Sequence, residues 1–389
     1  MAENRDEGSP ERTLADATVL AQAGYGVDPT TGAVVPPLHT ATTFGRDSDN
    51  ELVGGYLYSR YANPTVVHAE RLLAGLEGGA DAMLFASGLA AVAAVYETVP
   101  GGGRVVAPTV MYHGAQDWLR RIAERRGIGL TLFDATDPDG LGEALRAGET
   151  TLVWIESPVN PTWDVIDIRA AADQAHAAGA VLAVDSTVAS PMTTRGLDLG
   201  ADLVFHSATK YLNGHSDVLA GALITPEVNE IWEELQLIRR LSGGGLGARD
   251  AWMLIRGMRT LPLRFERSSK SALQIAQALE EHPSVDSVLY PGLESHPGHE
   301  VARRQMTNGF GGMLSILVKG GAKEALALTG RLHVFVRATS LGGVESLAEH
   351  RASVEGPHSV VPTNLVRLSI GIEDPADLIA DLEQALAGD

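Results

Sequence analysis

The most restrictive feature of this sequence is a regular alternation, from Asn63 onward, of short apolar segments with longer amphipathic ones. Apolar segments of strand length occur at 82–85, 104–107, 129–133, 151–155, 181–185 and 202–206. Segments of helical character lie between them, for example 112–126, 137–147 and 167–178. Strands that alternate with helices of this length form right-handed crossovers, which place the strands parallel in one sheet. We therefore predict an α/β fold with a mostly parallel central sheet.

The two ends of the chain have a different character. Residues 1–62 contain turn signals such as Asp28-Pro29 without sustained periodicity, which is typical of an extended arm. After a probable sheet strand at 218–224, a long helical region extends from Pro226 to about Glu281. Strand-like segments then follow at 285–289, 312–318 and 366–370, with helical segments at 321–330 and 374–387. We expect an arm over 1–62, a central domain over 63–256 and a small C-terminal α/β domain over 257–389.

Composition excludes several classes of function. The 30 basic residues do not cluster and are outnumbered by 49 acidic ones, so neither nucleic acid nor an anionic membrane is an expected partner. The chain has no cysteine, which excludes disulfides and thiolate chemistry, and its histidines show no metal-binding spacing. The polar N-terminus and the absence of a long apolar run predict a cytoplasmic protein, and the missing cysteines and scattered histidines predict no metal site.

The stretch Ser207-Ala208-Thr209-Lys210-Tyr211 follows the apolar segment at 202–206 and is the most informative one for chemistry. A lysine beside a strand end is usually only a surface charge. Here Ser207 and Thr209 add hydroxyl donors for an anion. Lys210 would form a Schiff base with a carbonyl cofactor if its site lowered its pKa from the ~10.4 of a free lysine.

Two other strand ends carry candidate ligand-binding residues. Asp185 closes the segment 181–185, at the carboxyl end where α/β sheets place their ligands. It either caps the following turn or pairs with a cation such as a protonated pyridine nitrogen. Such a pair would make the pyridine ring a stronger electron sink. Ser87, Gly88 and Leu89 lie at another strand-to-helix junction, where free backbone N–H groups can hold a phosphate.

Tyr112 and Arg367 also allow two interpretations each. Tyr112, at a further strand-to-helix junction, either packs at the rim of the core or stacks on an aromatic ring. Arg367 stands inside the otherwise apolar segment 365–371 and needs a carboxylate partner. An internal Asp or Glu would serve, and so would the α-carboxylate of a substrate.

Taken together, these segments resemble the Cys/Met-metabolism family of pyridoxal-phosphate enzymes, which includes cystathionine γ-synthase, cystathionine γ-lyase and methionine γ-lyase. The resemblance runs from about Tyr25 to the C-terminus. It is carried by motifs at 58–65 (YSRYANPT), 86–88 (ASG), 156–161 (ESPVNP), 207–211 (SATKY), 340–346 (SLGGVES) and by the Arg367 segment. It implies an aspartate-aminotransferase-like fold of type I and a homotetramer built as a dimer of catalytic dimers.

The resemblance also implies roles for individual residues around pyridoxal 5'-phosphate. Lys210 would be the Schiff-base lysine and proton shuttle, Asp185 would pair with the ring nitrogen, and Tyr112 would stack on the ring and serve as acid or base for the leaving group. Arg367, Asn160 and the segment Ser340-Leu341 would bind the substrate. Phosphate would be held by Ser87, Gly88, Leu89, Ser207 and Thr209, and by Tyr58 and Arg60 of a neighbouring subunit.

Substrate choice depends on a few other positions. Relatives that act on cystathionine tend to carry acidic residues at the positions of Leu57 and Thr339, which here offer no countercharge to a distal ammonium. The thioether of methionine would suit these neutral residues. Methionine γ-lyases usually carry a cysteine at the position of Gly114, however, and His113 stands where the family has glycine.

We therefore expect a carbon–sulfur lyase that catalyses α,γ-elimination of a small-molecule sulfur amino acid, converting L-methionine to methanethiol, 2-oxobutyrate and ammonia. Cystathionine γ-lyase or cystathionine γ-synthase activity is the enzymatic alternative. A third hypothesis is a catalytically silent scaffold that binds pyridoxal phosphate. The presence of Lys210, Asp185, Tyr112 and Arg367 argues against that third hypothesis.

Overall fold

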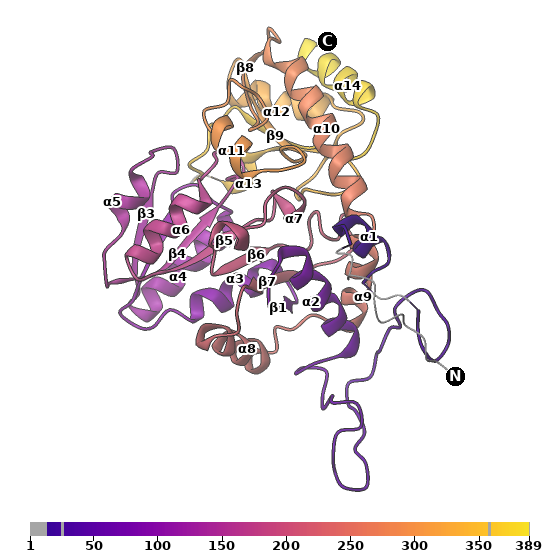
Figure 1. Cartoon of the computed structure of the whole chain (residues 1–389). Coiled ribbons are helices and arrows are strands. Elements are labelled where there is room, and N and C mark those ends of the chain that lie inside the picture. The colour runs from indigo at the N-terminus through magenta and orange to yellow at the C-terminus, as the bar shows by residue number, and fades with distance from the viewer. Residues whose placement is uncertain (1–13, 25–26, 357–358, 389) are drawn as a thin grey trace.

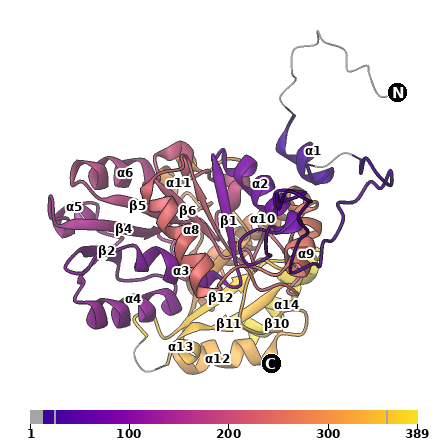
Figure 2. The ribbon, with the colours of Figure 1, turned by 90° about the horizontal axis from the view of Figure 1, so that it is seen from below.

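The computed structural model describes residues 14–24, 27–356 and 359–388, so the predictions for the first thirteen residues lie outside the described part. A large α/β unit and a smaller one lie next to each other, and the long helix α10 (Leu261–Glu280) extends from the first into the second (Figure 1). The N-terminal arm leaves the large unit on the side where α9 (Ala248–Met258) lies (Figure 2).

Within the described residues, the large unit is built on a seven-stranded sheet in the order β1-β7-β6-β5-β4-β2-β3. β7 runs antiparallel to its neighbours β1 and β6, and the other neighbouring pairs are parallel. The prediction of an α/β fold with a mostly parallel central sheet is confirmed. The strands are β1 (Asp81–Phe85), β2 (Arg104–Pro108), β3 (Gly129–Phe133), β4 (Thr150–Glu156), β5 (Val181–Asp185), β6 (Leu203–His206) and β7 (Gly221–Thr225).

Helices cover both faces of this sheet, and β4 shows the consequence for the sequence. Its side chains alternate between two cores, with Val153 and Ile155 in one and Leu152 and Trp154 in the other. A strand buried on both faces reads as a continuous apolar run, which is the pattern at 151–155. The first core is covered by α2 (Pro64–Glu77), α6 (Ile168–Ala177) and α9, and the second by α3 (Gly88–Glu97), α4 (His113–Arg126) and α8 (Glu230–Ser242).

The smaller unit has its own sheet and its own core. In the part of the chain that the structure describes, this sheet has the order β10-β11-β12-β9-β8. Helix α10 belongs to both units, because Leu261 and Phe265 pack in the large core whereas Ile275 and Leu279 pack in the small one. The elements are β8 (Val285–Leu289), β9 (Met313–Val318), β10 (Val336–Arg337), β11 (Leu347–His350), β12 (Leu365–Ser369), α12 (Ala322–Arg331) and α14 (Pro375–Ala387).

The structure differs from the sequence-based expectations mainly in short elements. The helical region from 226 to 281 divides into α8, α9 and α10, with a glycine-rich segment at 243–247 between the first two. The helix expected at 137–147 is shorter, α5 (Gly140–Ala144), and the strand expected at 218–224 begins at Gly221. Elements too short to show a periodicity were not predicted: α1 (Asp16–Ala21), α7 (Ser190–Thr193), η1 (Leu197–Leu199), α11 (His299–Gln305), α13 (Arg351–Glu355), β10 and β11.

The described part of the arm has little regular structure after α1. Its apolar residues Val34, Val53, Leu57 and Tyr58 are exposed. Several hydrogen bonds fasten it to the large unit, among them one from Trp252 Nε1 to the carbonyl of Pro36 at 2.9 Å and one from the His39 N–H to Thr65 Oγ1 at 2.9 Å. No helix in the three described ranges is long and apolar enough to span a membrane.

Candidate functional site

The carboxyl ends of three adjacent parallel strands meet at one edge of the large sheet. β4 ends with Glu156, β5 ends with Asp185, and Ser207 directly follows β6. The strand register pairs Glu156 with Asp185 and Asp185 with Phe205, so these side chains lie next to one another. A cavity of about 420 Å³ opens there, and its lining includes Ser87, Gly88, Leu89, Tyr112, His113, Glu156, Asn160, Asp185, Ser207, Thr209, Lys210, Thr339, Ser340, Leu341, Arg351, Val354 and Arg367.

Lys210 lies in the turn after β6, with its amine inside this cavity. Its Nζ donates a hydrogen bond to Ser340 Oγ at 2.7 Å, which connects the large unit to the small one. Burial, and to a smaller extent the positive charge of Arg367, lowers the pKa of Lys210 to about 8. At pH 7 about a tenth of this lysine is therefore a neutral amine, far more than for a free lysine, and the neutral amine is the form that attacks a carbonyl.

Asp185 and Glu156 are two buried carboxyl groups side by side. Burial raises the pKa of both, and the charge of Asp185 raises that of Glu156 further. Asp185 accepts a hydrogen bond from the backbone N–H of Thr187 at 2.9 Å. Among the described residues, no Lys, Arg or His forms an ion pair with Asp185. A cation supplied by a ligand would therefore stabilise the ionised carboxylate.

Glu156 was not selected from the sequence, although it belongs to the motif at 156–161. Its Oε2 accepts the backbone N–H of Tyr112 at 2.7 Å, and its Oε1 accepts that of Asn160 at 2.9 Å. One carboxylate thus fixes the backbone of two residues that border the cavity. The sequence did offer a signal for Glu156, since it is the first residue of the motif and ends an apolar strand. A buried acid at such a position needs hydrogen-bond donors.

The start of helix α3 provides free backbone N–H groups at the cavity. The Ser87 side chain caps the helix by accepting the N–H of Ala90 at 3.1 Å. Gly88 permits a close approach to Ser207, the residue that follows β6, because a Cβ on Gly88 would lie only 3.0 Å from Ser207 Oγ. Ser207 and Thr209 bring their hydroxyl groups to the same part of the lining, so the arrangement suits an anion such as a phosphate.

Tyr112 precedes helix α4 and is 41% exposed, so it lies at the rim of the core rather than inside it, and it lines the cavity. Its ring makes an edge contact with the His113 ring, with 5.0 Å between the centroids. Gly114 is not part of the lining but lies directly behind Tyr112. A Cβ on Gly114 would lie 3.0 Å from Cε1 of the Tyr112 ring, so this glycine determines where the ring can stand.

Arg367 is buried and donates hydrogen bonds to the Asn160 Oδ1 at 3.1 Å and to the Ser340 carbonyl at 2.9 Å. It has an internal carboxylate partner, since its Nη2 lies 2.6 Å from Glu349 Oε2. Arg367 also lines the cavity, where a substrate carboxylate can reach it. Glu349 and Arg351 were not selected from the sequence, because the short strand β11, which contains Glu349 and ends just before Arg351, was not predicted.

The residues predicted for the arm do not reach this cavity. Leu57, Tyr58 and Arg60 are absent from its lining, and Leu57 and Tyr58 are exposed. Arg60 instead donates a hydrogen bond to the carbonyl of Arg240 at 3.1 Å and lies over the rings of Tyr58 and Tyr61. Thr339 and Leu341, by contrast, do line the cavity beside Ser340.

The chemistry of this cavity fits pyridoxal phosphate. A buried carboxylate without a cationic partner (Asp185) suits a protonated ring nitrogen, and a lysine with a lowered pKa (Lys210) suits its aldehyde. The start of α3, with Gly88 close to Ser207, suits the phosphate. Tyr112 offers an exposed aromatic ring at the edge of the same cavity.

Comparisons with known proteins agree with this fit. The sequence model described as "Cys/Met metabolism PLP-dependent enzyme" matches residues 17–387. The cystathionine gamma-synthase of Mycobacterium tuberculosis is 45% identical over 376 residues, which cover 95% of this chain and 96% of that relative. The cystathionine gamma-lyase of Bacillus subtilis is 40% identical over 379 residues, covering 95% of this chain and 98% of that relative.

Solved structures show the same relationship in three dimensions. The apo form of CalE6, a methionine gamma lyase from Micromonospora echinospora, has a TM-score of 0.89 and 39% identity, covering 96% of this chain and 99% of the other. The match to the family extends over nearly all of the described residues, the cavity included. This chain therefore belongs to the family of Cys/Met metabolism enzymes that depend on pyridoxal phosphate.

Proposed function

We propose that this enzyme catalyses α,γ-elimination of a thiol from a methionine-like amino acid. The observation that carries the proposal is the neutral character of the cavity wall on both sides of Ser340. Thr339 and Leu341 line the cavity next to Ser340 in the chain, Val354 lines it as well, and none of the three offers a charge to a distal group of a substrate. The side chain of methionine is an uncharged thioether, which loses nothing by contact with such a wall.

In this proposal, Arg367, Asn160 and Ser340 bind the substrate carboxylate. Arg367 supplies the positive charge, while its hydrogen bonds to Asn160 and to the Ser340 carbonyl fix the plane of the guanidinium. A carboxylate held in this way fixes the orientation of the substrate Cα–H bond relative to Lys210. Orientation of this kind is a large part of the rate enhancement that an enzyme provides.

Lys210 and Tyr112 are the groups that we propose to move protons. Bound pyridoxal phosphate supplies an electron sink that acidifies the Cα and Cβ protons of the amino acid. Lys210, as a neutral amine, removes the Cα proton, and Ser340 Oγ keeps its Nζ in place. Once Lys210 has passed this proton on, it removes a proton from Cβ, and the electron pair of that C–H bond forms the Cβ=Cγ double bond as the Cγ–S bond breaks. Sulfur leaves with the electron pair of the broken bond, and Tyr112 delivers a proton to it. Water finally releases 2-oxobutyrate and ammonia, so one methionine and one water give three products.

Cystathionine chemistry is the second candidate, and the names of the relatives favour it. The relative from M. tuberculosis is named cystathionine gamma-synthase and that from B. subtilis cystathionine gamma-lyase. Cysteine or cystathionine would enter the same cavity, with Arg367 and Lys210 in unchanged roles. The distal ammonium of cystathionine would then lie against Thr339, a position without a countercharge.

We also propose a homotetramer in which the arm completes the site of a neighbouring subunit. Tyr58 and Arg60 stand on an exposed arm, away from the cavity of their own chain. A second copy would bring an arginine and a tyrosine hydroxyl to the phosphate, in addition to the groups around Gly88. Light scattering of the purified protein measures the assembly directly.

A substrate panel tests the proposed activity. The holoenzyme is given L-methionine, L-cystathionine, L-homocysteine, and an O-acylhomoserine together with cysteine, and 2-oxobutyrate and cystathionine are measured. We expect 2-oxobutyrate from methionine at the highest kcat/KM. Faster release of 2-oxobutyrate from cystathionine, or formation of cystathionine as the main product, would replace the proposal with the second candidate. The variant Thr339→Glu is the matched probe, since an added carboxylate should improve the relative rate with cystathionine.

A further inference from the structure

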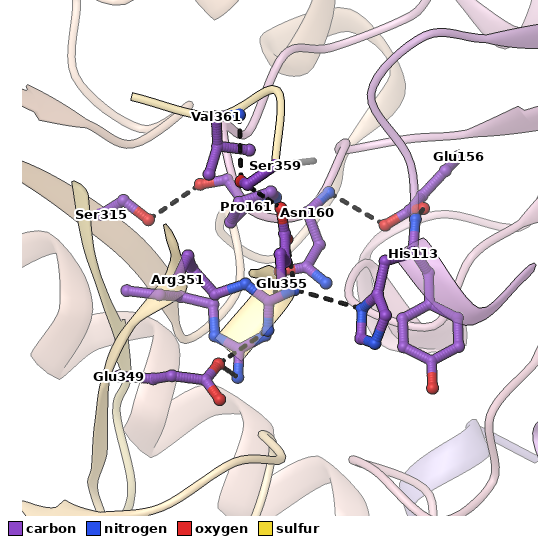
Figure 3. A network of polar contacts seen from close by, with 12 residues as sticks. His113, Glu156, Asn160, Pro161, Ser315, Glu349, Arg351, Glu355, Ser359 and Val361 are labelled. Carbon is purple, nitrogen blue, oxygen red and sulfur yellow. Dashed lines mark hydrogen bonds and ion pairs between the residues drawn. The ribbon is translucent and has the colours of Figure 1, made fainter. Parts of the chain in front are cut away.

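A second arginine stands behind the one that we propose to bind the substrate carboxylate. Arg351, at the start of α13, is 4% exposed and lies between two acidic residues (Figure 3). Its Nη1 contacts Glu349 Oε2 at 2.8 Å, and its Nη2 contacts Glu355 Oε1 at 2.6 Å. Glu349 Oε2 is the same oxygen that contacts Arg367 at 2.6 Å. Four buried charges therefore form one network, the Arg351 network: Arg351, Arg367, Glu349 and Glu355.

The position of Glu349 creates an electrostatic problem for substrate binding. A guanidinium that already faces a buried carboxylate has little net attraction for a second one, because the two negative charges repel each other at short range. Glu349 is 4% exposed, so water does little to screen it. With Arg367 and Glu349 alone, the site would be neutral before the substrate binds and negative afterwards.

Arg351 removes part of this problem by sharing the Glu349 carboxylate. Both arginines contact one oxygen, so the charge of Glu349 is divided between them. Arg351 lines the cavity, but its terminal nitrogens are already engaged: both contact the acids, and Nη2 is also 3.4 Å from His113 Nδ1. Its Nε is buried and makes no hydrogen bond to a described residue, so it is not exposed to a ligand in the cavity. Arg351 therefore acts on the substrate through Glu349.

His113 does not add a further charge to the network. Burial, followed by the positive charge of Arg351, lowers the pKa of His113, while Glu355, Asp117 and Glu349 act weakly in the opposite direction. The contact from Arg351 to Nδ1 also requires an imidazole that accepts at this nitrogen. A neutral His113 leaves two cations and two anions in the network, so each cation matters for the next anion that enters.

We propose that Arg351 is a positioning residue for the substrate carboxylate, holding the charge of Glu349 away from Arg367. This inference rests on the proposed role of Arg367 in substrate binding, and it does not depend on which sulfur amino acid reacts. Glu355 opposes Arg351 in this scheme, because it returns a negative charge to the network. The two residues are four positions apart on α13 and can be neutralised together.

The test separates the carboxylate from the rest of the ligand. Binding of L-norleucine and of L-norleucinamide to the holoenzyme is measured by calorimetry for the wild type and for Arg351→Gln, Glu355→Gln, the double variant and the surface control Arg303→Gln. Norleucine has the length of methionine but no leaving group, and the amide lacks only the carboxylate charge. The quantity compared is the ratio of the two Kd values, which we call the carboxylate preference.

We expect R351Q to lower the carboxylate preference by roughly tenfold or more, since a unit charge as far as about 12 Å away contributes that factor at an effective dielectric constant near 20. E355Q should raise the preference, the double variant should return close to the wild type, and R303Q should have no effect. Equal loss of both ligands in R351Q, or no recovery in the double variant, would mean a purely structural role and would overturn the inference.

The same experiment distinguishes this inference from the proposed function. If the wild type itself shows no carboxylate preference, then Arg367 does not bind the carboxylate, and both ideas fail. If the preference and its loss in R351Q are found but none of the sulfur amino acids is turned over, only the proposed activity fails. Recovery in the double variant also shows that the single variant had folded into a functional site.

Discussion

Glu156→Gln is the substitution that most directly tests how the cavity is held together. Both carboxylate oxygens of Glu156 accept backbone N–H groups, from Tyr112 at 2.7 Å and from Asn160 at 2.9 Å. A glutamine of the same shape has only one acceptor oxygen, so its NH₂ group must face one of these N–H donors. One hydrogen bond is lost, and a buried donor is left without a partner.

The magnitude follows from this count. A buried donor left without its acceptor costs about 1–3 kcal/mol. For a chain of this size we expect a fall of a few degrees in the midpoint of thermal unfolding. The kcat/KM should fall as well, because either Tyr112 or Asn160 moves when its amide is released. Glu149→Gln is the control, since Glu149 is exposed and makes only a 3.8 Å contact with Arg104.

The pH dependence of this difference has a defined sign. Burial and Asp185 raise the pKa of Glu156 in the folded protein above its unfolded value. The folded state then binds more protons, so the stability contributed by Glu156 falls as the pH rises between these two values. Glutamine does not titrate, so the deficit of E156Q should be largest at mildly acidic pH and shrink toward alkaline pH. Differential scanning calorimetry across this range measures it. An unchanged midpoint and an unchanged kcat/KM in E156Q would refute the reasoning.

Three other predictions concern the same cavity. Lys210→Ala should abolish turnover and the visible absorbance of the bound cofactor, and turnover that survived would exclude Lys210 as the attachment point. The rate at which the cofactor-free protein reacts with pyridoxal phosphate should rise with pH and level off near the lowered pKa of about 8, and Arg367→Gln should move this limit upward. Gly114→Ala should displace the Tyr112 ring and lower kcat with little change in melting temperature, whereas an unaltered kcat would mean that the ring adapts freely.

The central sheet and the residues at its strand ends were predictable because local pattern and tertiary structure agree there. The buried strand β5 reads as an apolar run that ends in Asp185, and Lys210 follows the next strand in the sheet. An acid or a lysine at such a position departs from the apolar pattern, so it can be recognised as a candidate functional residue from a single sequence. Gly88 is visible in the same way, as a glycine at the junction of β1 and α3.

The Arg351 network could not be predicted, because no apolar run precedes Glu349, Arg351 or Glu355 to make a charged residue stand out. Strand β11 has four residues, and two of them are Glu349 and His350, so no apolar alternation marks it. Its partner β12 lies beyond α13, and the pairing of Glu349 with Arg367 appears only when the register of β11 and β12 is known. The partners of Tyr58 and Arg60 are a different case, since the proposed contacts belong to another chain.

Helix α10 has a consequence for how this enzyme can handle substrates of different length. Its twenty residues extend for about 30 Å, with one half anchored in each core. Lys210 belongs to one of the bodies that this rod joins and Arg367 to the other. To widen the gap between amine and guanidinium, the rod would have to bend or one core would have to loosen, and close-packed interiors resist both. The distance between the Lys210 amine and the Arg367 guanidinium is therefore the same for every substrate. Substrates of different length can differ only in the part of their side chain beyond Cγ.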